Sequence, residues 1–224
     1  MSTKDQFDII TQIIFIILGF MVFWQIKIAK NDLRTKCKRE ACAISVELAK
    51  RFAEEIIPAI SKFYTKVRDA KYELKPLSLK TFQKEEIDRL GHPAKKLYDE
   101  GVAFFESNPK LRSECIKILN SFEALSMNFI KRVADEDAAF TALHQVYCHF
   151  TERAFPVLCV LRDDKNSRFY ENTLSLHKIW SNKMKIRGLE LQRKSIEEQM
   201  NGKAKEIDSI NYSIDKEKIT PIGV

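Results

Sequence analysis

The 224-residue sequence predicts an all-α fold, with an N-terminal transmembrane helix, a cytosolic helical bundle that begins with a long helix, and a coiled-coil-like C-terminal helix. An almost unbroken apolar run fills residues 9–26. Apolar residues beyond it recur at three- and four-residue steps, as on one face of a helix. Only six glycines and six prolines interrupt the chain, and alternating strand-like runs are few.

The apolar run is long enough to cross a membrane. About 18–20 residues at 1.5 Å each span a hydrocarbon core of about 30 Å, and no charge lies between Asp8 and Lys27. A cleavable signal peptide would be shorter, with a positive start and an A-x-A site. An interfacial helix would have a charged face. A buried core helix fits the basic flank less well, so we expect a transmembrane helix over 9–28.

The charges around this run predict its orientation. Residues 1–8 carry one lysine and two aspartates, whereas the other side is basic. The basic flank consists of Lys27, Lys30, Arg34, Lys36, Lys38 and Arg39. Because such residues stay in the cytosol, we expect residues 1–8 outside the inner (cell) membrane and the rest inside. The flank also faces lipid headgroups, or serves as a topology signal alone.

The composition indicates a folded domain in a reducing compartment. Apolar residues make up 45% and charged residues 31% of the chain, which is unlike a disordered protein. The net charge of +7 comes largely from the basic flank, so no nucleic-acid partner is expected. Five irregularly spaced cysteines, without a C-x-x-C pair, indicate free thiols.

The first half of the domain reads as one long helix, a loop and a short helix. An apolar stripe runs from Leu33 to Val67 and continues the membrane helix. Pro58 is expected to kink or end that helix. Residues 71–78 form a loop, and Ser78 is expected to cap a helix that ends near Leu90.

Four further helices follow. Pro93 and Pro109 each open one, since proline is tolerated in a first turn; these helices reach about residues 106 and 134. Asp135 is expected to cap a helix over 136–162, kinked at Pro156. After a turn at 163–166, another helix covers about 167–186.

Gly188 marks the predicted end of the cytosolic domain, 29–187, and the start of a C-terminal segment, 188–224. Its apolar residues fit heptad a and d positions, interrupted by Arg193 and Lys203. They are Leu189, Ile196, Met200, Ile207, Ile210 and Ile214. This pattern allows a helix that pairs with a second copy, a helix folded back on the domain, or a frayed tail.

Three segments carry a resemblance to a known family: LRSECIKILNSFEALSMNFI, FPVLCVLR and FYENTLSLHKIW. They contain an L-N-x-F-E motif, a proline helix ending in Leu-Arg, and an aromatic helix ending in Trp. The chain thus resembles a family of bacterial proteins with one N-terminal membrane span and a helical domain of unknown function. The resemblance implies this fold and topology, and a link to phage resistance or mobile elements, but no reaction.

Asn120 and Glu123 lie three residues apart on an apolar helix, so both side chains can face the same side. A carboxylate within a core needs a partner. Arg162, at the end of a later helix, is the expected partner in a partly buried contact. The alternative is that Glu123 faces solvent.

No catalytic signature is present. H-E-x-x-H, G-x-S-x-G and glycine-rich phosphate loops are all missing from the sequence. His144, Cys148 and Glu152 share a helix face at metal-ligand spacing, but a buried thiol explains Cys148 more simply. We expect neither an enzyme nor a bound cofactor or metal.

These features predict a single-pass membrane protein that presents a helical domain for self-association or for binding a cytosolic protein. The alternative is a membrane effector whose transmembrane helix oligomerises and disrupts the bilayer.

Overall fold

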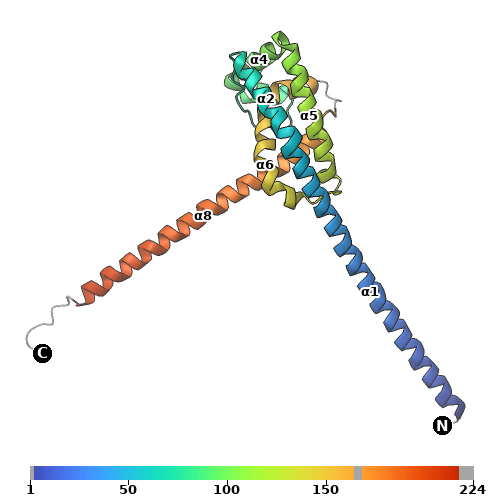
Figure 1. The fold of residues 1–224 in the computed structure, drawn as a ribbon. Coiled ribbons are helices and arrows are strands. Elements are labelled where there is room, and N and C mark those ends of the chain that lie inside the picture. Colours follow the sequence, from blue (N-terminus) through green and yellow to red (C-terminus); the bar gives the residue numbers. More distant parts are fainter. Residues whose placement is uncertain (1–2, 164–167, 217–224) are drawn as a thin grey trace, which may run out of the picture. The chain divides into compact units, whose positions relative to one another are not determined.

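The computed structural model describes residues 3–163 and 168–216, with side chains for 18–163, 168–208 and 210. All regular elements in these ranges are helical, which confirms the predicted all-α fold (Figure 1). The chain divides into two compact units, Met1–His177 and Lys178–Val224.

A long first helix opens the chain, as predicted. α1 (Thr3–Arg51) continues through a π-helical turn, η1 (Phe52–Ile56), into α2 (Ile57–Asp69). Pro58 explains the irregular turn, because it has no N–H to donate and its ring crowds the preceding turn. The N–H of Ile57 instead bonds the carbonyl of Phe52, five residues back. The predicted kink at Pro58 is therefore a π-helical turn.

In the part of the chain that the structure describes, no helix combines the length and the apolar content of a membrane span. The predicted span, 9–28, begins among residues 1–17, whose side chains lie outside the described residues. The side chains of the predicted N-terminal segment, 1–8, lie outside them as well. Both therefore remain predictions.

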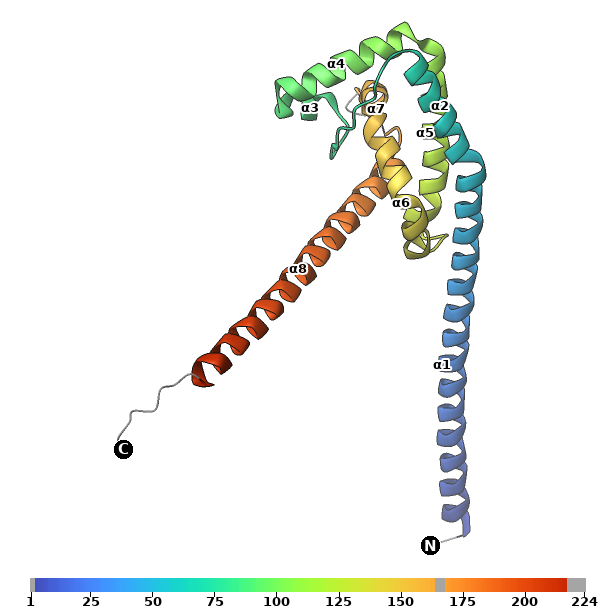
Figure 2. The ribbon, with the colours of Figure 1, turned by 60° about the vertical axis from the view of Figure 1, so that its left-hand side comes forward.

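Five further helices lie wholly within the first unit. They are α3 (Lys84–Leu90), α4 (His92–Ser107), α5 (Pro109–Ile130), α6 (Glu136–Arg153) and α7 (Phe155–Leu161). α2 packs against α5, α1 against α6, and α4 against α7 (Figure 2).

An aromatic cluster forms the centre of the core. The ring of Phe122 on α5 stacks on Tyr147 of α6, with 4.4 Å between ring centroids. It also contacts Phe52 of η1 at 5.8 Å and Phe150 of α6 at 5.3 Å. All four side chains are almost completely buried. The π-helical turn therefore directs Phe52 into the cluster that joins α5 and α6.

Three helix starts agree with the sequence. Pro93 and Pro109 lie in the first turns of α4 and α5. The carboxylate of Asp135 accepts the N–H groups of Asp137 and Ala138 at 3.1 and 3.2 Å, as an N-cap does. The helix predicted over 136–162 is instead two helices, because the helical backbone breaks at Ala154 and Pro156 lies in the first turn of α7.

The start predicted at Ser78 is wrong. α3 begins at Lys84, and residues 72–79 form an extended loop. The carboxylate of Glu86 bonds the loop instead, accepting the N–H groups of Lys80 and Thr81 at 2.6 and 2.7 Å. Because Glu86 fixes residues 80–82 in a non-helical path, the helix starts later.

The turn before α6 is attached to the second half of α1. The N–H of Asp135 donates to the carbonyl of Ala41 at 3.2 Å. The hydroxyl of Ser45, which is buried, donates to the carbonyl of Asp135 at 2.8 Å. These bonds hold α1 against α6 from about residue 41 onward.

α8 (Glu171–Lys216) is a single helix of 46 residues. It begins in the first unit and continues through the second. It passes through Gly188, where the sequence predicts a domain boundary, without a break. The chain's division falls after His177 instead. The turn predicted at 163–166 and the end of the tail lie mostly outside the described residues.

Candidate functional site

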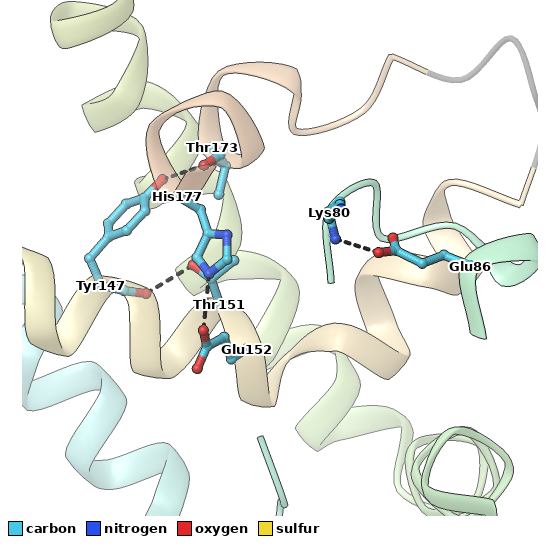
Figure 3. A network of polar contacts seen from close by, with 7 residues as sticks. All are labelled: Lys80, Glu86, Tyr147, Thr151, Glu152, Thr173 and His177. Atoms are coloured by element: carbon cyan, nitrogen blue, oxygen red, sulfur yellow. Dashed lines mark hydrogen bonds and ion pairs between the residues drawn. The ribbon is translucent and has the colours of Figure 1, made fainter. Parts of the chain in front are cut away.

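A cluster of buried and half-buried polar side chains lies where α5, α6 and the first turns of α8 meet, and Figure 3 shows its members on α6 and α8. Its members are Glu123, Ser126, Tyr147, Thr151, Glu152, Thr173 and His177. Ser126, Thr151 and Thr173 are completely buried, and His177 is almost so. Buried polar groups need hydrogen-bond partners, so the geometry of each group decides its role.

Glu123 of α5 caps the start of α8. One carboxylate oxygen accepts the backbone N–H and the side-chain amide of Asn172, at 3.2 and 2.7 Å. The other accepts the backbone N–H and the hydroxyl of Thr173, at 2.8 and 2.7 Å. The first N–H groups of a helix have no partner within the helix and carry partial positive charge. A carboxylate from another helix thus satisfies two of them.

Tyr147 of α6 joins the same turn of α8 to α5. Its hydroxyl donates to the carbonyl of Thr173 at 3.0 Å and lies 2.6 Å from the hydroxyl of Ser126. Ser126 in turn donates to the carbonyl of Phe122 at 2.5 Å. Burial raises the pKa of Tyr147 well above its usual range, so the phenol stays protonated. It serves as a hydrogen-bond donor within the core.

His177 and Glu152 connect α8 with α6 and the loop before α3. The Nε2 atom of His177 lies 3.4 Å from a carboxylate oxygen of Glu152, and the rings of His177 and Phe82 make a T-shaped contact with 5.4 Å between centroids. The hydrogen bond from His177, followed by the opposing effect of burial, leaves the pKa of Glu152 below its usual value. The backbone carbonyl of Glu152 accepts the N–H of Leu77 at 3.0 Å. His177, through Phe82, and Glu152, through Leu77, therefore both fix the loop before α3 onto the bundle.

The structure separates the polar residues that the sequence groups together. Asn120 accepts the hydroxyl of Tyr170 at 2.8 Å. The guanidinium of Arg162 donates to the carbonyl of Phe169, and its buried Nε has no hydrogen-bond partner among the described residues. No hydrogen bond or ion pair joins Glu123 to Arg162 in these residues; Glu123 bonds Asn172 and Thr173 instead. Sequence reasoning missed Tyr147, Thr173 and His177.

The thiol, imidazole and carboxylate groups that the sequence suggests for catalysis or metal binding are either buried or bonded to other residues. Burial raises the pKa of the Cys159 thiol to about 12 and that of Cys115 further still, which disfavours a reactive thiolate. His144 bonds the carbonyl of Phe140, and Glu152 faces His177. Among the described residues, no group of three or more His, Cys, Asp and Glu side chains could hold a metal ion.

The basic flank follows the exposed apolar part of α1. All of its six members, Lys27, Lys30, Arg34, Lys36, Lys38 and Arg39, are exposed. They occupy about four turns of continuous helix. The ammonium of Lys27 lies 5.9 Å from the ring centroid of Trp24. The flank thus lies between the apolar segment and residue 41, where α1 meets the bundle.

Residues 12–180 match a family described as a domain of unknown function, DUF4760. The match covers more than half of the chain. The chain belongs to this family. No curated protein and no solved structure matches it. The DUF4760 region contains the polar cluster and all the helices from η1 to α7, as well as the basic flank of α1.

Proposed function

We propose that the protein is anchored in a membrane through α1. Its helical domain is held at the cytosolic face of the inner membrane, where it binds a second copy or a cytosolic protein. The observation that carries this proposal is the exposure of five consecutive apolar side chains, Phe20–Trp24, with exposed fractions from 54 to 68%.

Consecutive residues of an α-helix differ by about 100°, so these five cover the full circumference of α1. A single partner helix would cover one stripe, whereas lipid surrounds a helix on every side. Fully burying one such side chain is worth about 1.5–3 kcal/mol. In the sequence this surface is part of a run from Ile9 to Ile26 that carries no charge and is about 27 Å long as a helix.

The continuous helix between the apolar segment and the bundle supports the second half of the proposal. The basic flank lies on this part of α1, where each charge near anionic lipid is worth about 1 kcal/mol. Ser45 and Asp135 then attach α1 to α6. A continuous helix linked by these bonds would hold the domain at a defined distance from the headgroups.

An interaction role accounts for the remaining features better than catalysis does. The side chains of the polar cluster hold helices together through hydrogen bonds, and the three thiols within the helical domain, those of Cys115, Cys148 and Cys159, are buried. The long exposed helix α8 offers a surface for another protein. A link to phage resistance rests on the family resemblance alone and stays a prediction.

A membrane effector is the second candidate function. Gly19 is compatible with it, because no other part of the described chain lies within 4 Å of a Cβ placed there, which leaves that side of α1 open to a second helix. Small residues let transmembrane helices approach closely. In this version α1 oligomerises and permeabilises the bilayer. Membrane potential discriminates the two functions, since a simple anchor leaves the potential unchanged on expression.

Two measurements test the proposed anchor and its orientation. The full chain should sediment with membranes, and a chain that begins at Lys27 should remain soluble. On inside-out vesicles, protease should digest the helical domain and spare the first residues. Equal sedimentation of both chains, or protection of the domain, would contradict the proposal.

A further inference from the structure

The second unit of the chain has an apolar stripe at heptad spacing on α8. Six exposed apolar residues occupy it: Ile186, Leu189, Ile196, Met200, Ile207 and Ile210. With Ile186 at heptad position a, Leu189, Ile196 and Ile210 fall at d, and Met200 and Ile207 at a. The exposed fractions of the six range from 49 to 66%. Water would therefore contact this stripe on an isolated chain.

The spacing indicates what kind of partner fits. A repeat of seven residues in two turns has a period of 3.5, slightly less than the 3.6 of a straight helix. A stripe with this period stays in contact only with another helix around which it supercoils to the left. A second copy of α8 has the same repeat by construction.

The charges beside the stripe favour a parallel copy. In a parallel pair, position g of one helix faces the next e of the other. Lys185 at g would then meet Glu190 at e of the second copy, and both side chains are exposed. Gln192 at g would meet Glu197 at e, so neither contact opposes like charges.

An antiparallel pair is less favourable at the same flanks. Both arrangements place basic residues opposite one another, Arg193 against Lys203 in the antiparallel register with the largest overlap and each against its own copy in the parallel pair. Only the antiparallel register also brings Glu197 beside its own copy. Like charges at such positions disfavour association. The parallel pair gains the Lys185–Glu190 attraction and lacks the Glu197 repulsion.

Two charged residues interrupt the stripe itself. Arg193 at a forms an ion pair with Glu197 of the same helix, with 2.8 Å between nitrogen and oxygen. Lys203 at d is exposed and has a long stem that can extend from the contact to water. Polar residues at core positions lower stability but select register and strand number. Arg193 faces Arg193 of the other copy, and Lys203 faces Lys203, only when the two helices are in register.

We infer that α8 pairs with α8 of a second copy as a parallel, in-register, two-stranded coiled coil over about residues 186–210. This rests on the self-association included in the proposed function and specifies its surface. Leu191 provides an internal control. It is 68% exposed, like the stripe, but falls at position f on the opposite side of the helix.

Cysteine cross-linking of the full chain in membranes tests the inference. The exposed Cys37 and Cys42 are first changed to serine to remove background reaction. Met200→Cys or Leu191→Cys is then introduced, and a mild oxidant is added. Because a positions of a parallel pair face each other, Met200→Cys should give about tenfold more disulfide-linked dimer than Leu191→Cys.

Charge reversal provides a second, independent readout. Lys185→Glu should reduce the cross-linking of Met200→Cys, because Glu190 of the other copy then meets a like charge. Adding Glu190→Lys should restore it. Equal cross-linking at positions 191 and 200 would overturn the inference. So would preferential cross-linking of Met200→Cys to a differently tagged chain with Ile196→Cys, which indicates an antiparallel pair.

The same samples separate this inference from the membrane anchor. The distribution between membrane and soluble fractions is measured for every variant. A chain that stays in the membrane without cross-linking at Met200→Cys overturns the coiled coil alone. A chain that cross-links but is found in the soluble fraction overturns the anchor alone.

Discussion

One carboxylate oxygen of Glu123 accepts two hydrogen bonds from Thr173, from its backbone N–H at 2.8 Å and from its hydroxyl at 2.7 Å. Glu123 belongs to α5 and Thr173 to the third position of α8. A residue from the centre of the bundle therefore determines where α8 begins. If α8 carries the contact with a second copy, this bond ties that surface to the domain.

Glu123→Ala should lower the free energy of unfolding by about 0.5–2 kcal/mol, as other lost N-caps do. For a domain of this size, that corresponds to about 2–4 °C in melting temperature per kcal/mol. The measurement is thermal unfolding of a chain from residue 31 onward, followed by circular dichroism. Glu114→Ala, on the same helix in an exposed ion pair with Lys66, serves as the control and should change stability by less than about 1 kcal/mol. Equal effects of the two substitutions would contradict the cap.

Tyr147→Phe should destabilise the domain by about 1–3 kcal/mol, because the buried carbonyl of Thr173 would lose its donor from Tyr147. The ring stack with Phe122 would remain. Urea unfolding measures the loss. Tyr72→Phe is the matched control: its ring stacks on Phe104 at 4.1 Å, and it should change stability by less than about 0.5 kcal/mol. If Tyr147→Phe left the free energy of unfolding unchanged, the hydroxyl of Tyr147 would not contribute to stability.

Gly101→Ala and Gly202→Ala should have opposite effects although both glycines lie within helices. A Cβ at Gly101 would lie 2.5 Å from a ring carbon of Pro156, so α4 and α7 would have to separate. Such overpacking costs about 1–3 kcal/mol. At Gly202 a Cβ meets no atom within 4 Å, and alanine should favour the helix by about 0.5–1 kcal/mol. Melting temperature and helical content test both; a stabilising Gly101→Ala would show that α4 and α7 are not in close contact.

Acid should weaken the domain through Glu86 and Glu152. Burial raises the pKa of Glu86, but hydrogen bonds from Lys80, Thr81 and Phe82 outweigh it, so the pKa is lowered overall. The pKa of Glu152 is lowered mainly by His177. Since both folded values lie below the ordinary 4.5, their stabilisation is complete above that pH and is lost as the pH falls through the folded values.

Glu152→Gln should therefore lower stability at neutral pH and flatten its decline below about pH 4.5. Unfolding free energy measured between neutral and acidic pH gives this slope. An exposed carboxylate such as Glu106, changed to Gln, should leave the slope as it is. If the unfolding free energies of the parent protein and of Glu152→Gln fell equally with decreasing pH, the proposed role of the Glu152–His177 pair would be refuted.

Local chemistry made several helix starts predictable. Pro93, Pro109 and Asp135 act on groups within one turn, so the sequence places them correctly. Ser78 failed as a cap because Glu86, eight residues later, binds the intervening backbone more effectively. A competition of this kind depends on loop geometry that no short pattern contains.

The partner of Glu123 was not predictable for a related reason. The need for a partner follows from its position on an apolar helix, and that part is correct. Thr173 lies 50 residues away, and Arg162 was the nearer charged choice. Backbone N–H groups are present at every helix start, so composition cannot indicate which one a carboxylate reaches.

The boundary predicted at Gly188 does not end the helix, because one glycine within a helix costs about 1 kcal/mol, which is too little to end a long helix.

Extraction of membranes with alkaline carbonate tests the central claim, that α1 is a membrane anchor, most directly. Carbonate opens vesicles and releases peripheral proteins, but leaves transmembrane helices in the lipid. The full chain should remain in the pellet, and should be released when Phe20 and Phe23 are both changed to aspartate, since each charge within the bilayer costs about 2.5–3.5 kcal/mol. Recovery of the unaltered full chain in the supernatant would contradict the account.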